Sequence, residues 1–186
     1  MNLDRLTHLL DTRPPATDLD AEIEQLWDDQ GPNGTQKFVR ALILADPGWQ
    51  APQKLAGSIT AGQSRWGDAA RHFHRAALTK PNTPAEPDSP ALILQAAHSY
   101  FMDRNYEAAL RCCDLNLARA GESAEALFLL GRSRILLGDA KAGQALINRA
   151  AEINADYRFA SRVMRMALTT DDFDRVLARE GLGPRF

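Results

Sequence analysis

The chain has 186 residues, of which 45% are hydrophobic and 25% charged, and its formal net charge at pH 7 is -2. This length allows a sizeable hydrophobic core, and the composition is that of an ordinary globular protein. A net charge so close to zero gives no general reason to expect nucleic acid or an anionic membrane as a partner. The charge is unevenly distributed, because residues 1–30 contain eight acidic residues and two arginines.

The compartment can be argued from what the sequence lacks. No run of about 18 apolar residues occurs, and the first residues show no basic start followed by an apolar core. We therefore expect neither a membrane-spanning helix nor a signal peptide. The two cysteines, Cys112 and Cys113, are neighbours, and adjacent cysteines in a helix point in different directions and rarely pair. These features predict a cytoplasmic protein without a disulfide framework.

The first fifty residues read as short helices separated by helix-breaking residues. Apolar residues at helical spacing predict helices over 3–10, 20–29 and 38–44. The prolines within 13–17 and the Gly-Pro-Asn-Gly sequence at 31–34 predict breaks between them, and Asp46-Pro47 predicts the end of the third. After the last repeat described below, a helix over 158–169 and a shorter one over 171–179 are expected.

A regular pattern begins after residue 50. A predicted helix over 53–62 is followed by a turn and a second helix over 64–81. Ala69, Phe73, Ala76 and Pro81 mark a small contact residue, a core residue, a second small residue and the helix end. Residues 91–100 then align with 125–134, thirty-four positions later, with small residues Ala97 and Gly131 at the expected helix contact. A period of this length is typical of stacked pairs of antiparallel helices.

In these small residues, turns and helix ends the chain resembles the tetratricopeptide repeat (TPR) family. The resemblance implies an all-α solenoid of about four TPR-like hairpins with a C-terminal capping helix pair. As one domain over 1–186, it divides into an N-terminal helix (1–15), a degenerate repeat (16–49), a repeat (50–83), a proline-rich insert (84–89), repeats 90–123 and 124–157, and capping helices (158–180). Proline every third residue favours an extended connector in the insert; a loop that covers the groove or recruits a proline-recognising module is the alternative.

Members of this family hold a peptide or helical segment of a partner in a groove lined by the first helix of each pair. By resemblance, the groove-facing positions are Lys54, Ser58, Leu94, His98, Phe101, Met102, Phe128, Arg132, Ile135, Arg162 and Met166. A clamp for two carboxylates is poorly supported, because Ser58 stands where an asparagine would be needed. Phe128 and Ile135 beside Arg132 instead suggest apolar anchors next to a positive charge. The alternative is that these aromatic residues belong to the core between repeats.

No catalytic, cofactor or metal motif stands out. His72 and His74 project to different faces of a helix, the cysteines lack zinc spacing, and no phosphate-binding glycine loop occurs. RNA recognition by helical repeats would need a basic groove. We therefore expect a non-enzymatic adaptor or chaperone that binds another protein, with neither nucleic acid nor membrane as a partner. A self-assembling subunit of a larger complex and a regulatory module that docks on a separate enzyme are the alternatives.

Overall fold

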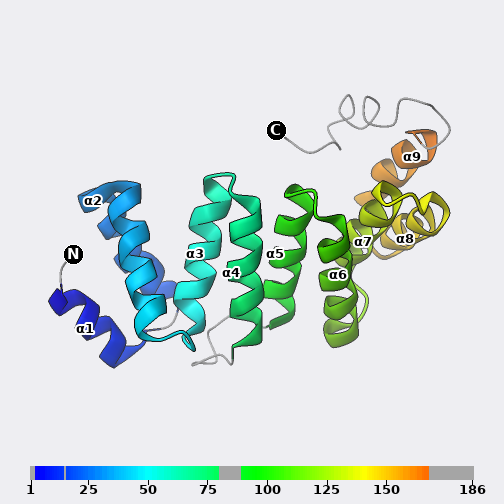
Figure 1. Ribbon diagram of the computed structural model, residues 1–186. Coiled ribbons are helices and arrows are strands. Elements are labelled where there is room, and N and C mark those ends of the chain that lie inside the picture. The colour runs from blue at the N-terminus through cyan, green and yellow to red at the C-terminus, as the bar shows by residue number, and fades with distance from the viewer. Residues whose placement is uncertain (1–2, 15, 80–88, 168–186) are drawn as a thin grey trace. The chain divides into compact units, whose positions relative to one another are not determined.

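The computed structural model describes residues 3–14, 16–79 and 89–167, and within these ranges every regular element is an α-helix (Figure 1). The helices are α1 (Leu3–Thr12), α2 (Ala16–Ala45), α3 (Gln50–Gly62), α4 (Trp66–Leu78), α5 (Ser89–Met102), α6 (Tyr106–Ala120), α7 (Ala124–Leu136), α8 (Ala140–Ile153) and α9 (Tyr157–Ala167). The predicted all-α fold of antiparallel helical hairpins is confirmed. The chain divides into two compact units, Met1–Ser99 and Tyr100–Phe186, and the expectation of one domain stays a prediction.

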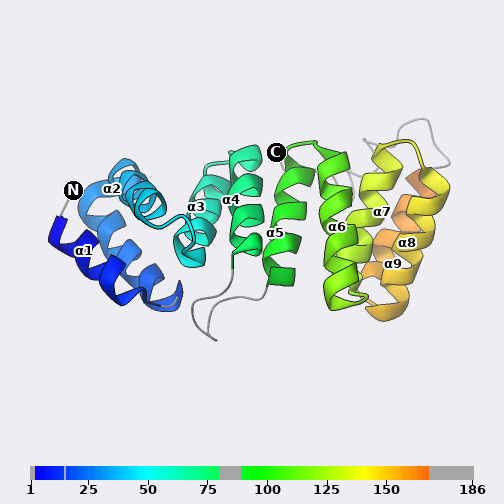
Figure 2. The ribbon, with the colours of Figure 1, turned by 60° about the horizontal axis from the view of Figure 1, so that its bottom comes forward.

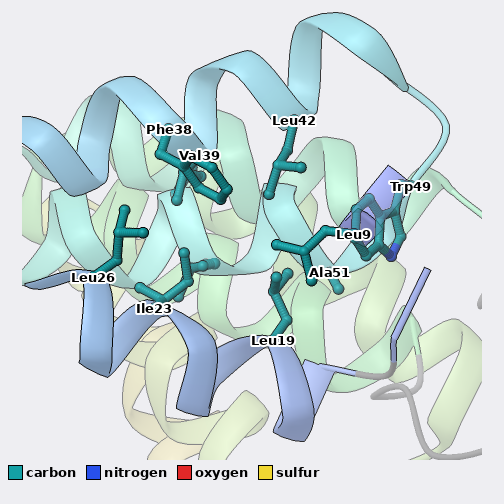
Figure 3. Close-up of a cluster of buried hydrophobic side chains, with 11 residues drawn as sticks. Leu9, Leu19, Ile23, Leu26, Phe38, Val39, Leu42, Trp49 and Ala51 are labelled. Carbon is teal, nitrogen blue, oxygen red and sulfur yellow. The ribbon is translucent and has the colours of Figure 1, made fainter. Parts of the chain in front are cut away.

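The core of the N-terminal unit lies among α1, α2 and α3 (Figure 3). Leucine and isoleucine at helical spacing on the first half of α2 face an apolar stripe on its second half, so burial follows directly from the sequence period. Large side chains in it that are at most 3% exposed include Leu9, Leu19, Leu26, Phe38, Leu42 and Trp49. Trp49 has no exposed surface and lies between the end of α2 and the start of α3. It therefore joins these two helices through the core.

The break predicted at 31–34 is present but shorter than a four-residue turn. Helix α2 is interrupted at Gly31, with φ 67° and ψ -178°, and helical backbone resumes directly after it. Glycine adopts this left-handed φ without steric cost. Pro32 fits immediately after the break, since the missing N–H of a proline needs no partner in the first turn of a helix. The hydroxyl of Thr35 donates to the Gly31 carbonyl at 3.0 Å and closes the kink.

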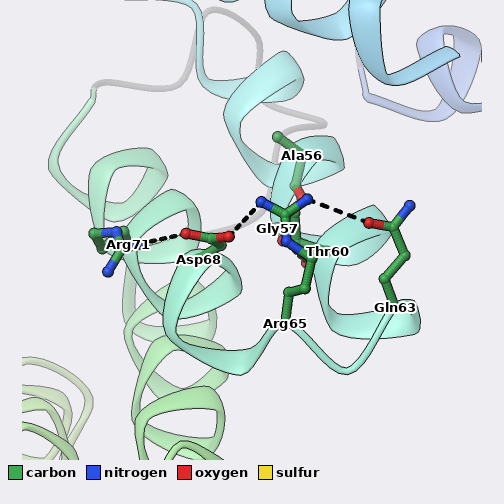
Figure 4. A network of polar contacts seen from close by, with 7 residues as sticks. All are labelled: Ala56, Gly57, Thr60, Gln63, Arg65, Asp68 and Arg71. Carbon is green, nitrogen blue, oxygen red and sulfur yellow. Dashed lines mark hydrogen bonds and ion pairs between the residues drawn. The ribbon is translucent and has the colours of Figure 1, made fainter. Parts of the chain in front are cut away.

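The hairpin of α3 and α4 has the close helix contact that the repeat pattern predicts. A Cβ added to Gly57 would lie 2.7 Å from the ring of Phe73, so the two helices meet where a side chain is absent. Ser64, with φ 57°, forms the tight turn between the helices. Figure 4 shows the polar network that follows it, in which Asp68 pairs with both Arg65 and Arg71. These ion pairs are partly exposed, so packing supplies most of the stability of the hairpin.

The C-terminal unit repeats the same construction, and α6, α7, α8 and α9 lie side by side in it (Figure 2). Asn105 and Asp139, one repeat length apart, each cap a helix by accepting a hydrogen bond of 3.2 Å from the backbone N–H three residues later. Such caps stabilise a helix by about 1 kcal/mol. The residue before each cap, Arg104 or Gly138, has positive φ. The residue with positive φ and the capping residue after it therefore recur at the repeat length.

Helix α9 covers the last hairpin, as expected of a capping helix. Val163 and Met164 are at most 5% exposed and pack against Ile135 and Ile147. The hydroxyl of Ser161 donates to Asn148 at 2.7 Å. The second predicted capping helix, over 171–179, lies outside the described residues, as does most of the proline-rich insert. Within the described ranges, no helix has both the length and the apolar character that a bilayer span requires.

The two cysteines belong to the core of α6, where both thiols are buried. Burial raises the pKa of Cys112 to about 11 and that of Cys113 to about 12. Because the thiolate is the reactive species, we expect both to react with a disulfide reagent at about pH 8 at least a hundredfold more slowly in the folded protein than in urea, with Cys113 the slower of the two. Stopped-flow measurement of thiol release checks this. Equal rates with and without urea would contradict the core placement.

Candidate functional site

An arginine packed among aromatic rings lies at the centre of the predicted groove residues of the C-terminal unit. The guanidinium carbon of Arg132 lies 4.5 Å from the centroid of the Phe101 ring and 5.6 Å from that of Phe128. Tyr106 packs against Phe101, with ring centroids 5.4 Å apart, and Tyr157 against Phe128, at 4.9 Å. We call these five residues the arginine–aromatic cluster. A guanidinium over an aromatic face is attracted by the ring quadrupole.

Burial shows that part of this cluster is core. Phe101 is only 4% exposed. Burial lowers the pKa of the Arg132 guanidinium, and the electrostatic interaction with Tyr106 partly offsets this by raising it. Ile135 is 8% exposed and packs against Val163 and Met164. The expectation that Phe101 and Ile135 present open apolar surface to a partner is therefore corrected, because neighbouring helices already cover both side chains. The sequence pattern could not distinguish a groove position from a core position, since a residue on the first helix of a hairpin can face either the groove or the neighbouring helices.

The remaining predicted residues outside the cluster have varied surroundings. Met102 is half-buried at the end of α5. Arg162 is exposed on α9, with its guanidinium carbon 5.7 Å from the centroid of the Phe159 ring. Met166 lies on α9, but its side chain is outside the described residues. Leu94 is half-buried and His98 exposed, both on α5. Their proposed contacts with a partner stay predictions.

A pocket of about 580 Å³ opens between the first half of α2 and α3 in the N-terminal unit. It contains two of the predicted groove residues, Lys54 and Ser58, side by side on one face of α3. The other lining residues come mostly from α2. The pocket is lined by Asp20, Ile23, Glu24, Trp27, Asp28, Lys54, Leu55 and Ser58. We call it the α2–α3 pocket.

The α2–α3 pocket combines an apolar floor with a negatively charged wall. Ile23 and Leu55 belong to the core beneath it, while the indole of Trp27 is 39% exposed at its side. Asp20 and Glu24 share one face of α2, because residues four apart on a helix are neighbours. Nζ of Lys54 lies 3.5 Å from Oδ2 of Asp20 and balances one of the carboxylates.

The α2 side of this pocket is not among the predicted groove residues, which in this unit lie on α3 and α5. The repeated acids with an intervening tryptophan were the available signal. Among the residues that the structure describes, no group of three or more histidine, cysteine, aspartate or glutamate side chains is arranged to hold a metal ion.

Comparison with known proteins supports the fold. No protein-family model matches the chain, and no curated protein matches it by sequence. Its structure resembles a crystal structure of MamA, with a TM-score of 0.62 and 12% identity over 86% of this chain and 85% of that one. It also resembles residues 41 to the end of MamA from Desulfovibrio magneticus RS-1, with a TM-score of 0.64 and 15% identity over 89% and 91% of the two chains.

A MamA double mutant gives the same TM-score of 0.64 at 15% identity, over 90% of this chain and 91% of that one. Likeness at such low identity shows a shared TPR-like, all-helical fold.

Proposed function

We propose that this protein is a member of the tetratricopeptide repeat family that acts as an adaptor or chaperone, without catalysis, and receives a segment of a partner protein in the α2–α3 pocket. The observation that carries the proposal is the pocket itself, in which an exposed tryptophan stands beside an apolar floor and a charged rim. An indole left 39% exposed in a concave site is stabilised when a partner removes it from water.

The size and composition of the pocket support this role. Binding pockets commonly have volumes of about 300–1,000 Å³ and combine apolar walls with a few polar groups that orient the ligand. Tryptophan is also among the residues that contribute most to protein–protein binding energy. A pocket of about 580 Å³ accommodates one or two side chains of a partner segment, with the flanking backbone along the helices.

The proposal is tested by covalent capture in the source cells. A small aliphatic diazirine amino acid, close to leucine in size and much smaller than an indole, is placed at Ser58, which is exposed and lines the pocket, and in a matched variant at Leu44, which is 70% exposed on the second half of α2. We expect mass spectrometry to identify a partner peptide cross-linked through residue 58 and absent from the residue 44 variant. Identical adducts at both positions, or none at 58, would contradict binding in the pocket. An adduct between two copies of this chain would favour the self-assembling alternative.

A further inference from the structure

We propose that the segment received by the α2–α3 pocket is basic, with an arginine whose guanidinium stacks on Trp27 and pairs with Glu24 and Asp28. An aliphatic residue next to that arginine packs over Ile23 and Leu55. The inference rests on the proposed function and adds the chemistry of the partner. It follows from the charge of the pocket and the kind of aromatic surface exposed there.

The charge of the pocket favours a cation. Three carboxylates line it, from Asp20, Glu24 and Asp28, and Lys54 is its only basic lining residue. Lys54 pairs with Asp20, whereas Glu24 and Asp28 form no ion pair within the described ranges of the chain. Two negative charges therefore remain for a partner to balance.

Other acidic residues near the pocket add to its negative electrostatic potential. Between Arg13 and Lys37 the sequence has six acidic residues and no lysine or arginine. Of these acids, Glu22 pairs with Arg5, whose Nε donates to its carboxylate at 2.8 Å. A cluster of one charge attracts an oppositely charged segment over about a Debye length, roughly 10 Å at moderate salt. The same field repels phosphate, which disfavours nucleic acid and anionic lipid as occupants.

Trp27 specifies which cation fits best. Its indole is exposed between the positions of Glu24 and Asp28 on α2, and tryptophan is the strongest aromatic acceptor for a cation. A guanidinium is planar, so it stacks on the ring while its edge donates paired hydrogen bonds to a carboxylate. An ammonium group offers the charge without this planar match. The pocket is therefore expected to prefer arginine to lysine.

The test uses a phage-displayed library of random peptides selected on the intact protein. We expect the recovered peptides to be enriched in arginine adjacent to leucine, isoleucine or valine. A synthetic peptide of the most enriched sequence is then titrated by fluorescence anisotropy. The double variant Glu24→Gln, Asp28→Asn should weaken its binding about tenfold, because two charge-assisted contacts are lost. Affinity should also fall as salt is raised.

Two further variants separate the possible outcomes. Asp29→Asn removes an exposed acid that does not line the pocket, and it should leave the affinity within about twofold. Ser58→Trp fills the pocket from α3 without changing charge and should abolish binding. Enriched peptides that are neutral or acidic, yet blocked by Ser58→Trp, would overturn the basic partner and keep the proposed function. Peptides insensitive to Ser58→Trp, or no recovered peptide, would overturn both.

Discussion

Phe101→Ala is expected to lower the free energy of unfolding by about 3–5 kcal/mol, the usual loss for a buried aromatic residue replaced by alanine. The Phe101 ring is 4% exposed, packs against Tyr106 and stacks beneath the Arg132 guanidinium. Its loss leaves a cavity and removes a cation–π contact of the half-buried Arg132 guanidinium. Urea denaturation followed by far-UV circular dichroism measures the change.

A matched variant shows whether this loss comes from the core. Arg162→Ala changes another predicted groove residue, but its side chain is exposed, so its effect on unfolding should stay within about 0.5 kcal/mol. The structure thereby changes the expectation for Phe101 from a binding defect to a stability defect. A Phe101→Ala protein that unfolds like the parent but no longer captures a partner would restore the groove interpretation.

Gly143→Ala is expected to destabilise the C-terminal unit by about 1–3 kcal/mol, because the added methyl group has no space. A Cβ at residue 143 would lie 2.5 Å from the carbonyl oxygen of Gly131 and 2.5 Å from Cγ1 of Ile135. One of these atoms belongs to the backbone of the facing helix, so α7 and α8 must move apart. Moving α7 and α8 apart also exposes part of the side chain of Ile147 on α8, which is otherwise fully buried.

The control for this prediction is Gly62→Ala at the end of α3. A Cβ there meets nothing within 4 Å, and alanine is the better helix former by about 1 kcal/mol. We therefore expect this variant to be as stable as the parent or slightly more so, as measured by urea denaturation. If Gly143→Ala behaved like Gly62→Ala, the close approach of α7 and α8 would be refuted.

The spacing of residues along the chain predicts the helices and their pairing. Small residues at positions such as Gly57 and Gly131 recur with the repeat, because two helices can approach closely only where no side chain intervenes. The capping residues Asn105 and Asp139 recur for a similar reason, since the first N–H groups of a helix need acceptors. These helix contacts and caps depend on residues close together in the sequence. Each hairpin could therefore be predicted without knowing which other helices pack against it.

Which side chains remain available to a partner depends on packing between helices and cannot be predicted from residue spacing. Phe101 and Ile135 have the spacing of groove residues, yet packed helices and rings cover them, whereas Trp27 stays exposed in a pocket. The break at 31–34 was predicted, but only the structure shows that it is confined to Gly31, where it lets both halves of α2 bury their apolar faces. Exposure depends on contacts between elements far apart in the chain, and helical periodicity records only the face of a helix, not what covers it.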